Sequence, residues 1–258
     1  MVKRNLYGVK IVSYKVLLMR KPEQAPAKTQ PRARKAAGRT TSPRAGRGRR
    51  TSRAETAPYH HGALRDALLE AAERVLERDG LPGLTLRAVA REAGVSHAAP
   101  THHFGDLTGL VSELAAIGFR QFNAAMAAAC GGGELSINER AVARAKAYVA
   151  YAQAHPGMYG LMFRTERLDY SRPSLHEAAE ASFAGLAGAI AAKRREKISE
   201  DALTLDQAAA IARAWSLVHG FTMLLLDGRL EDIIDRLPDG SSTEQLLDAM
   251  LKVTVMKD

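Results

Sequence analysis

The side chains with the clearest capacity for chemistry are histidines. Five of the eight in the chain lie between residues 60 and 103, namely His60, His61, His97, His102 and His103. Imidazole binds metals, but adjacent histidines on a helix point in different directions, and no carboxylate or thiol stands at ligand spacing beside them. We therefore predict no metal site and no cofactor, and expect these histidines to serve another purpose.

Three of these histidines follow a short helix and a turn. The segment LTLRAVAREAGVS (84–96) is followed by HAAPTHHF (97–104). Thr85 is placed to cap a short helix, Gly94 to close it in a left-handed conformation, and Val95 to fill the core behind the turn. A second short helix begins near Ser96 or His97, because Pro100 fits only in a first turn. This order is typical of a helix-turn-helix.

The second helix of such a motif enters the major groove of DNA. Small side chains at Ala98 and Ala99 permit close approach, and their methyl groups can touch thymine. Thr85 and the amides after it are suited to hold a phosphate. His103, next to Phe104, can be either a packed, hydrogen-bonded residue or a contact to DNA. The predicted DNA-binding residues are Thr85, Arg87, Ser96, His97, Ala98, Ala99, Thr101, His102 and His103.

The elements around this motif also read as helices. Leu64, Leu68, Val75 and Leu76 form one apolar stripe that Gly80 ends. Longer helices follow, with no run of alternating β-branched residues. Their expected positions are an Asp106-capped helix to Gly131, then 136–154, 158–163, 174–197, 204–226, 230–237 and 243–255. Capping-box spacing marks the starts at Ser136, Ser174 and Thr204. We predict an all-α protein of about ten helices.

The charge is concentrated at one end of the chain. Residues 1–57 contain 16 Lys and Arg against two acidic residues, a net +14, whereas the remainder carries −5. Residues 21–57 lack large apolar side chains, which predicts a disordered tail. Its arginines at 44–50 would attract phosphate without reading sequence. The alternatives are a solvated or artificially added extension, or a true first residue at Met19 or later.

The motifs together resemble the TetR/AcrR family of bacterial transcriptional regulators. The resemblance rests on YHHG (59–62), LTLRAVAREAGVSHAAPTHHF (84–104) and the Asp-capped helix after it. HPGMYGLMF (155–163) and WSLVHG (215–220) are similar to a C-terminal domain type named for its Trp-His-Gly signature. The implied organisation is a basic tail (1–57), a helix-turn-helix domain (58–106) and a helical effector-binding and dimerisation domain (107–258).

The resemblance implies a cytoplasmic, ligand-responsive regulator without a membrane segment, and we expect a repressor. It would bind a palindromic DNA operator as a homodimer and be released by a small-molecule effector. Two long helices, 174–197 and 204–226, carry small residues that suit the dimer interface; the alternative is that their alanines serve helix propensity alone. Most large side chains of this half are expected to be core; the predicted effector-pocket residues are Phe122, Tyr148, Tyr151, Met162 and His219.

Two positions depart from the family pattern. Thr101 stands where the family usually has Tyr, and Leu107 where it has a Lys, so two phosphate anchors are weakened. Residues 59–121 also carry a net −2. We therefore hypothesise that the basic tail supplies attraction to DNA. The alternative functions are a tail-driven, sequence-independent DNA-coating protein and an enzyme. Catalysis is disfavoured, since Ser216 and His219 lie one turn apart without any nucleophile elbow or phosphate loop.

Overall fold

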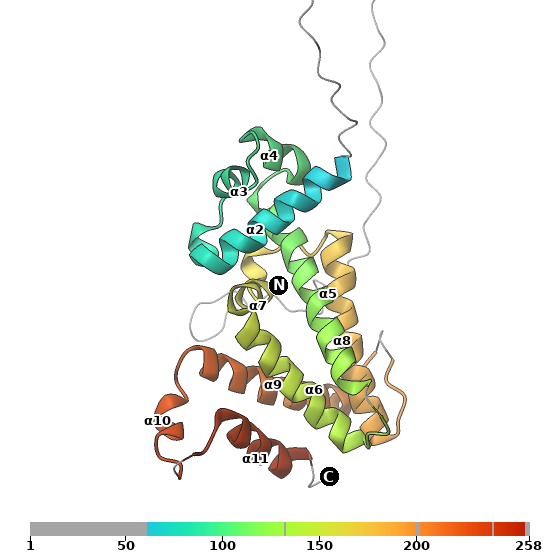
Figure 1. The fold of residues 1–258 in the computed structure, drawn as a ribbon. Coiled ribbons are helices and arrows are strands. Elements are labelled where there is room, and N and C mark those ends of the chain that lie inside the picture. The colour runs from blue at the N-terminus through green and yellow to red at the C-terminus, as the bar shows by residue number, and fades with distance from the viewer. Residues whose placement is uncertain (1–60, 132, 200–201, 239, 256–258) are drawn as a thin grey trace, which may run out of the picture.

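The computed structural model describes residues 61–131, 133–199, 202–238 and 240–255 (Figure 1). The predicted tail, residues 1–57, and His60 lie outside them. Ten α-helices and one 3₁₀ turn make up the described part, which contains no strand, so the all-α prediction is confirmed. The helices are α2 (His61–Gly83), α3 (Leu86–Glu92), α4 (Ala98–Phe104), α5 (Leu107–Cys130), α6 (Ile137–Ala154), α7 (Pro156–Met162), η1 (Thr165–Arg167), α8 (Pro173–Arg194), α9 (Leu205–Leu226), α10 (Glu231–Ile234) and α11 (Thr243–Val255).

Most of the predicted helix starts are confirmed by their caps. The hydroxyl of Thr85 accepts a hydrogen bond from the Ala88 amide, and the carboxylate of Asp106 accepts one from the Gly109 amide. Complete capping boxes start α6 at Ser136 and α9 at Thr204. Each cap satisfies an amide that the helix itself leaves unpaired.

Two predicted elements differ in the structure. The capping box expected at Ser174 is wrong: Pro173 is the first residue of α8, Arg172 precedes it without a side-chain cap, and the Ser174 hydroxyl makes no hydrogen bond. Proline suits the first helical position because its fixed φ is already helical and its missing N–H would be unpaired there. The helix expected over 230–237 is a single turn, α10.

The first helix is interrupted where its end was predicted. Gly80 has φ +66° and ψ −178°, and one more helical turn, residues 81–83, follows the kink. A left-handed φ of this kind costs glycine little. The kink turns the chain toward α3 and so sets the first part of the helix-turn-helix against α2.

The helices form two connected groups (Figure 1). α2, α3 and α4 lie together at one end, and α5 leads away from them beside α8, with α6 and α7 next to it. One cluster of buried side chains runs from Leu68 in α2 through Leu114 in α5 to Ala178 in α8. The core is therefore continuous across Asp106, the predicted domain boundary. A second cluster, around Phe221 and Leu247, holds α9 and α11 against α6.

Helix α9 is unusually apolar for its exposure. By length and mean hydropathy it is the one described helix that could cross a membrane, and only 17% of its most apolar window is buried. Leu205 is 85% exposed and Leu224 is 44% exposed. Such a surface on a helix needs a partner, and its place beside α8 bears on the function proposed below.

Candidate functional site

The helix-turn-helix is built as the sequence predicts. Gly94, at φ +67°, turns the chain between α3 and α4, and Val95 packs against the core. In α4, Pro100 and Phe104 are buried and anchor the helix. Ser96, His97, Ala98, Thr101 and His102 are all exposed on the other side. The motif thus presents one polar, sterically open face to solvent.

The other predicted DNA-binding residues lie around this face. Thr85 and Arg87 are exposed, and the Thr85 hydroxyl accepts a hydrogen bond from the Ala88 amide at 3.1 Å. Ala99 and His103 are half-buried. The His103 ring packs 5.4 Å from that of His102 and 6.3 Å from that of Phe104, so it supports the helix from its side. Contact of these residues with DNA stays a prediction.

Few cations of this half remain available to phosphate. Arg74 and Arg78 both bind Glu92, at 3.0 and 2.9 Å, and Arg65 binds Glu113 at 2.6 Å. The hydrogen bonds from Arg78 and Arg74 hold the pKa of Glu92 below its ordinary value, so this carboxylate stays charged. Arg87 and Arg91, both on α3, are exposed.

Helix α4 is tied to α8 at its last residue. Arg172, directly before α8, donates a hydrogen bond from Nη2 to the Phe104 carbonyl oxygen at 3.0 Å and lies 3.5 Å from Glu113. The guanidinium of Arg65 lies 5.5 Å from the centre of the Phe104 ring. A side chain at Gly109 would collide with both the Phe104 carbonyl and Arg172. We call Arg65, Glu113, Arg172 and Phe104 the Arg172 clamp.

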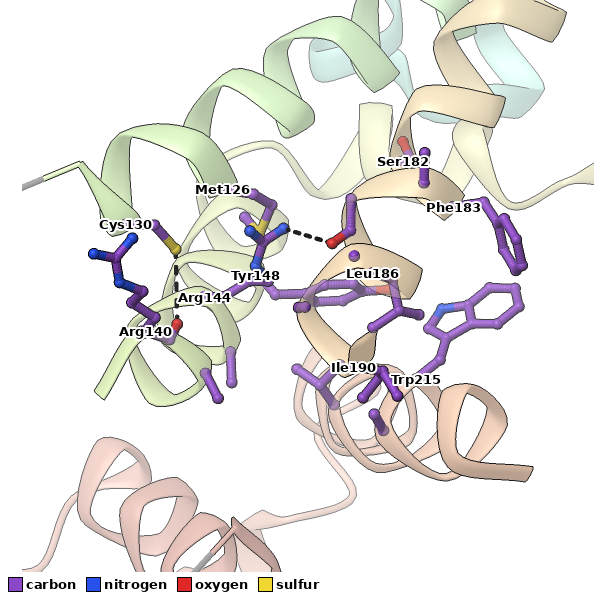
Figure 2. A pocket seen from close by; sticks show the side chains of 18 of the residues that line it. Met126, Cys130, Arg140, Arg144, Tyr148, Ser182, Phe183, Leu186, Ile190 and Trp215 are labelled. Carbon is purple, nitrogen blue, oxygen red and sulfur yellow. Dashed lines mark hydrogen bonds between the residues drawn. The ribbon is translucent and has the colours of Figure 1, made fainter. Parts of the chain in front are cut away.

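A cavity of about 570 Å³ lies between α5, α6, α8 and α9 (Figure 2). Its wall is mainly apolar, with Phe122 and Met126 from α5, Leu186 from α8 and Trp215 from α9. That volume falls in the range of pockets for small molecules. Of the five predicted pocket residues, Phe122 and Tyr148 line the cavity.

The remaining three predicted pocket residues are not part of the cavity wall. Met162 is fully buried in the core, and the hydroxyl of Tyr151 donates to the Gly118 carbonyl at 3.1 Å. His219 lies behind the wall, where its Nδ1 is 2.9 Å from the Tyr148 hydroxyl and 2.8 Å from the Tyr159 hydroxyl. Burial lowers the pKa of His219 and raises that of Tyr159. Tyr148 therefore joins the cavity to a hydrogen-bonded triad of Tyr148, Tyr159 and His219.

The prediction from sequence missed two arginines on the cavity wall. Arg144 lies one turn and Arg140 two turns before Tyr148 on α6, and both line the cavity. Their spacing of four residues, continued to Tyr148, was the available signal, because such residues share one helix face. Gly185, opposite Arg144 on α8, was also missed; nothing in the local sequence marks it as part of a wall.

The family models match both halves of the chain. Residues 68–114 match the model of bacterial regulatory proteins of the tetR family, and residues 141–252 match the tetracyclin repressor-like C-terminal domain. The chain belongs to the TetR family. Its resemblance to that family is thereby confirmed, and the domains indicate a transcriptional regulator rather than an enzyme.

Solved structures are similar to this TetR family protein over most of its length. A protein of unknown function from Rhodococcus sp. RHA1 is 34% identical, with a TM-score of 0.63, covering 78% of this chain and 97% of its own. A TetR-like transcriptional regulator from the same organism is 14% identical with a TM-score of 0.50, and the match covers 76% of this chain and 97% of that one. The regulator FadR from Bacillus subtilis, solved in complex with stearoyl-CoA, is 14% identical with a TM-score of 0.53. The match covers 74% of this chain and 97% of the FadR chain. A comparison with curated proteins finds no match.

Proposed function

We propose that this TetR family protein binds a palindromic operator as a homodimer and that a small-molecule effector weakens the complex. The observation that carries the proposal is the exposed face of α4, held from behind by Pro100 and Phe104. A helix that is fixed by its buried side and open on its other side can lie in the major groove.

The residues on that face suit base reading. His97 and Ala98 stand at the start of α4, where recognition helices approach base edges, and both are exposed. The imidazole of His102 can donate or accept a hydrogen bond, and the methyl group of Ala98 fits against thymine. Thr85, at the start of α3, is placed for a phosphate.

A second subunit would cover the exposed side of α8 and α9. Ala181, Gly188 and Ala192 on α8 and Ala212 on α9 are small and exposed, and Leu224 near the end of α9 is a large exposed apolar residue. Small side chains let helices approach closely, and large exposed apolar ones gain from burial. A two-fold dimer would set two copies of α4 about one helical turn of DNA apart.

The cavity would receive the effector. FadR, which shares the fold, is known in complex with an acyl-CoA, which supports a small molecule as the signal. An effector releases DNA only to the extent that it prefers the state with misplaced recognition helices. The Arg172 clamp supports such coupling, since it links α4 to α8, a wall of the cavity. We propose that the protein acts in the cytoplasm as a repressor.

Selection of bound duplexes from a random pool by the full chain tests this function. We expect a palindromic consensus, bound about 10³-fold or more tighter than random DNA at physiological salt. His102→Ala should weaken consensus binding, whereas His176→Ala on α8 should leave it unchanged. Equal affinity for consensus and random DNA would instead indicate a sequence-independent DNA-coating protein.

The same assay, repeated without residues 1–57, tests the contribution of the basic tail. We propose that the tail adds nonspecific attraction, so its deletion should lower affinity and flatten the dependence of affinity on salt concentration. Unchanged affinity and slope would remove the tail from the mechanism.

A further inference from the structure

Basic side chains belong to the wall of the cavity. Arg140, Arg144, Lys193 and Arg213 belong to its wall, and no described Asp or Glu does. Arg144 is half-buried on α6, in the middle of a predominantly apolar wall. Taking a guanidinium out of water is costly unless an anion or hydrogen-bond acceptors replace the water.

The hydrogen bonds of Arg144 do not meet that need. Its Nη1 donates to the Gly185 carbonyl oxygen at 3.4 Å, which is longer than the usual 2.7–3.2 Å (Figure 2). Among the described residues, Gly185 is the one hydrogen-bond partner of the Arg144 side chain. A guanidinium carries five N–H donors in a planar fork. Most of the donors of Arg144 are therefore available to a molecule in the cavity.

The surroundings leave room at this guanidinium. Gly185 faces it from α8, and a side chain there would begin 3.4 Å from Nη1. Glycine inside a helix is destabilising relative to alanine, so its place opposite Arg144 suggests a use for the space. Arg140 lies one turn away on α6 at the cavity edge, exposed, with its Nε bonded to the Leu135 carbonyl at 3.0 Å.

We propose that the effector is a small amphipathic anion. Its oxyanion, such as a carboxylate, binds the guanidinium of Arg144. Its apolar body lies among Phe122, Leu186 and Trp215. An oxyanion accepts two parallel hydrogen bonds from a guanidinium, which fixes the head while the apolar wall accommodates the rest. This inference rests on the proposed function, because it names the class of effector for that site.

Three probes with the same twelve-carbon chain separate head-group charge from apolar burial: dodecanoate, dodecanol and dodecylamine, each used below the concentration at which it forms micelles. The single tryptophan of the sequence, Trp215, lines the cavity, so its fluorescence in the full chain reports binding there. We expect dodecanoate to bind about tenfold or more tighter than the other two. Equal affinities, or a preference for dodecylamine, would overturn the proposal without any variant.

Substitutions assign the preference to its residue. Arg144→Met keeps an apolar stem of similar length and should abolish the preference for dodecanoate while dodecanol still binds, which also shows that the cavity is intact. Arg167→Met, an exposed arginine on η1 outside the cavity, is the matched control and should bind as the wild type does. A preference that survives Arg144→Met would contradict the assignment.

Failure of this inference and failure of the proposed function give different results. A chain that selects a palindromic operator but does not discriminate between the three head groups remains a regulator with another class of effector. A chain that prefers dodecanoate but selects no DNA sequence keeps its anion site and loses the proposed function.

Discussion

At the scale of single residues, the hydrogen-bonded triad of Tyr148, Tyr159 and the half-buried His219 offers a pH-dependent readout. Burial lowers the pKa of His219 from its ordinary value of 6.5. The unfolded chain therefore binds a proton at this residue more readily than the folded protein does. Stability from His219 is fully present above pH 6.5 and decreases as the pH falls toward the lower pKa of the folded state.

We predict that replacing His219 flattens the acid side of the stability profile. In urea unfolding at pH 7.5 and 5.5, the wild type should lose more stability on acidification than His219→Gln, whose amide can still bond the tyrosine hydroxyls. His176→Gln, on the surface of α8, should keep the wild-type slope. An equal loss in wild type and His219→Gln would show that the triad does not sense protons.

At the scale of helices, the Arg172 clamp determines how firmly α4 is held. The guanidinium of Arg172 donates to the last carbonyl of α4 and lies near Glu113 in α5. Its charge-assisted hydrogen bond closes the end of α4, where backbone carbonyls lack helical partners.

We predict that Arg172→Ala destabilises the fold by about 1–3 kcal/mol and weakens operator binding, because a charge-assisted bond is lost and α4 is freed. Arg164→Ala, which removes an exposed pair at 3.9 Å, should cost less than about 0.5 kcal/mol. Thermal unfolding and operator titration measure both. Wild-type stability and affinity in Arg172→Ala would contradict a role for the clamp.

The helix starts show what local sequence determines. Thr85, Asp106, Ser136 and Thr204 all cap as predicted, since the cap and its amide lie within three residues of each other. Ser174 had the same spacing, but Pro173 starts the helix one residue earlier. Where two local signals overlap, spacing alone does not decide between them.

The residues that line the cavity are harder to predict from sequence, because the lining depends on how helices rotate against each other. Tyr148 and Tyr151 are both aromatic and both buried on α6, yet only Tyr148 reaches the cavity. Arg140 and Arg144 share its helix face, which periodicity could have indicated. Gly185 belongs to the wall through its place opposite α6, which only the packed structure shows.

At the scale of the whole molecule, the exposed small and apolar residues of α8 and α9 predict a homodimer. We expect a dimer in analytical ultracentrifugation that Leu224→Glu converts to a monomer, since the charge would be buried in the interface. Operator affinity should fall about 100-fold or more, because the two half-sites are no longer bound by one linked particle.

Ile233→Glu is the matched control for that experiment. It replaces another exposed apolar residue with the same charge, since Ile233 is 49% exposed and lies on α10, outside α8 and α9. It should leave both the dimer and its DNA affinity intact. A Leu224→Glu protein that sediments as a dimer would place the interface elsewhere.

The unbroken run of α5 makes it a lever. It leaves the recognition helix at Asp106 and reaches the cavity at Phe122 and Met126 within 24 residues, a length of about 36 Å. Pivoting this rod by about 5° at its distal end would swing the proximal end by about 3 Å, close to the 3.4 Å rise of one base pair. In a symmetric dimer the two displacements would add. A bound effector that tilts α5 only slightly would therefore move both copies of α4 out of register with successive major grooves.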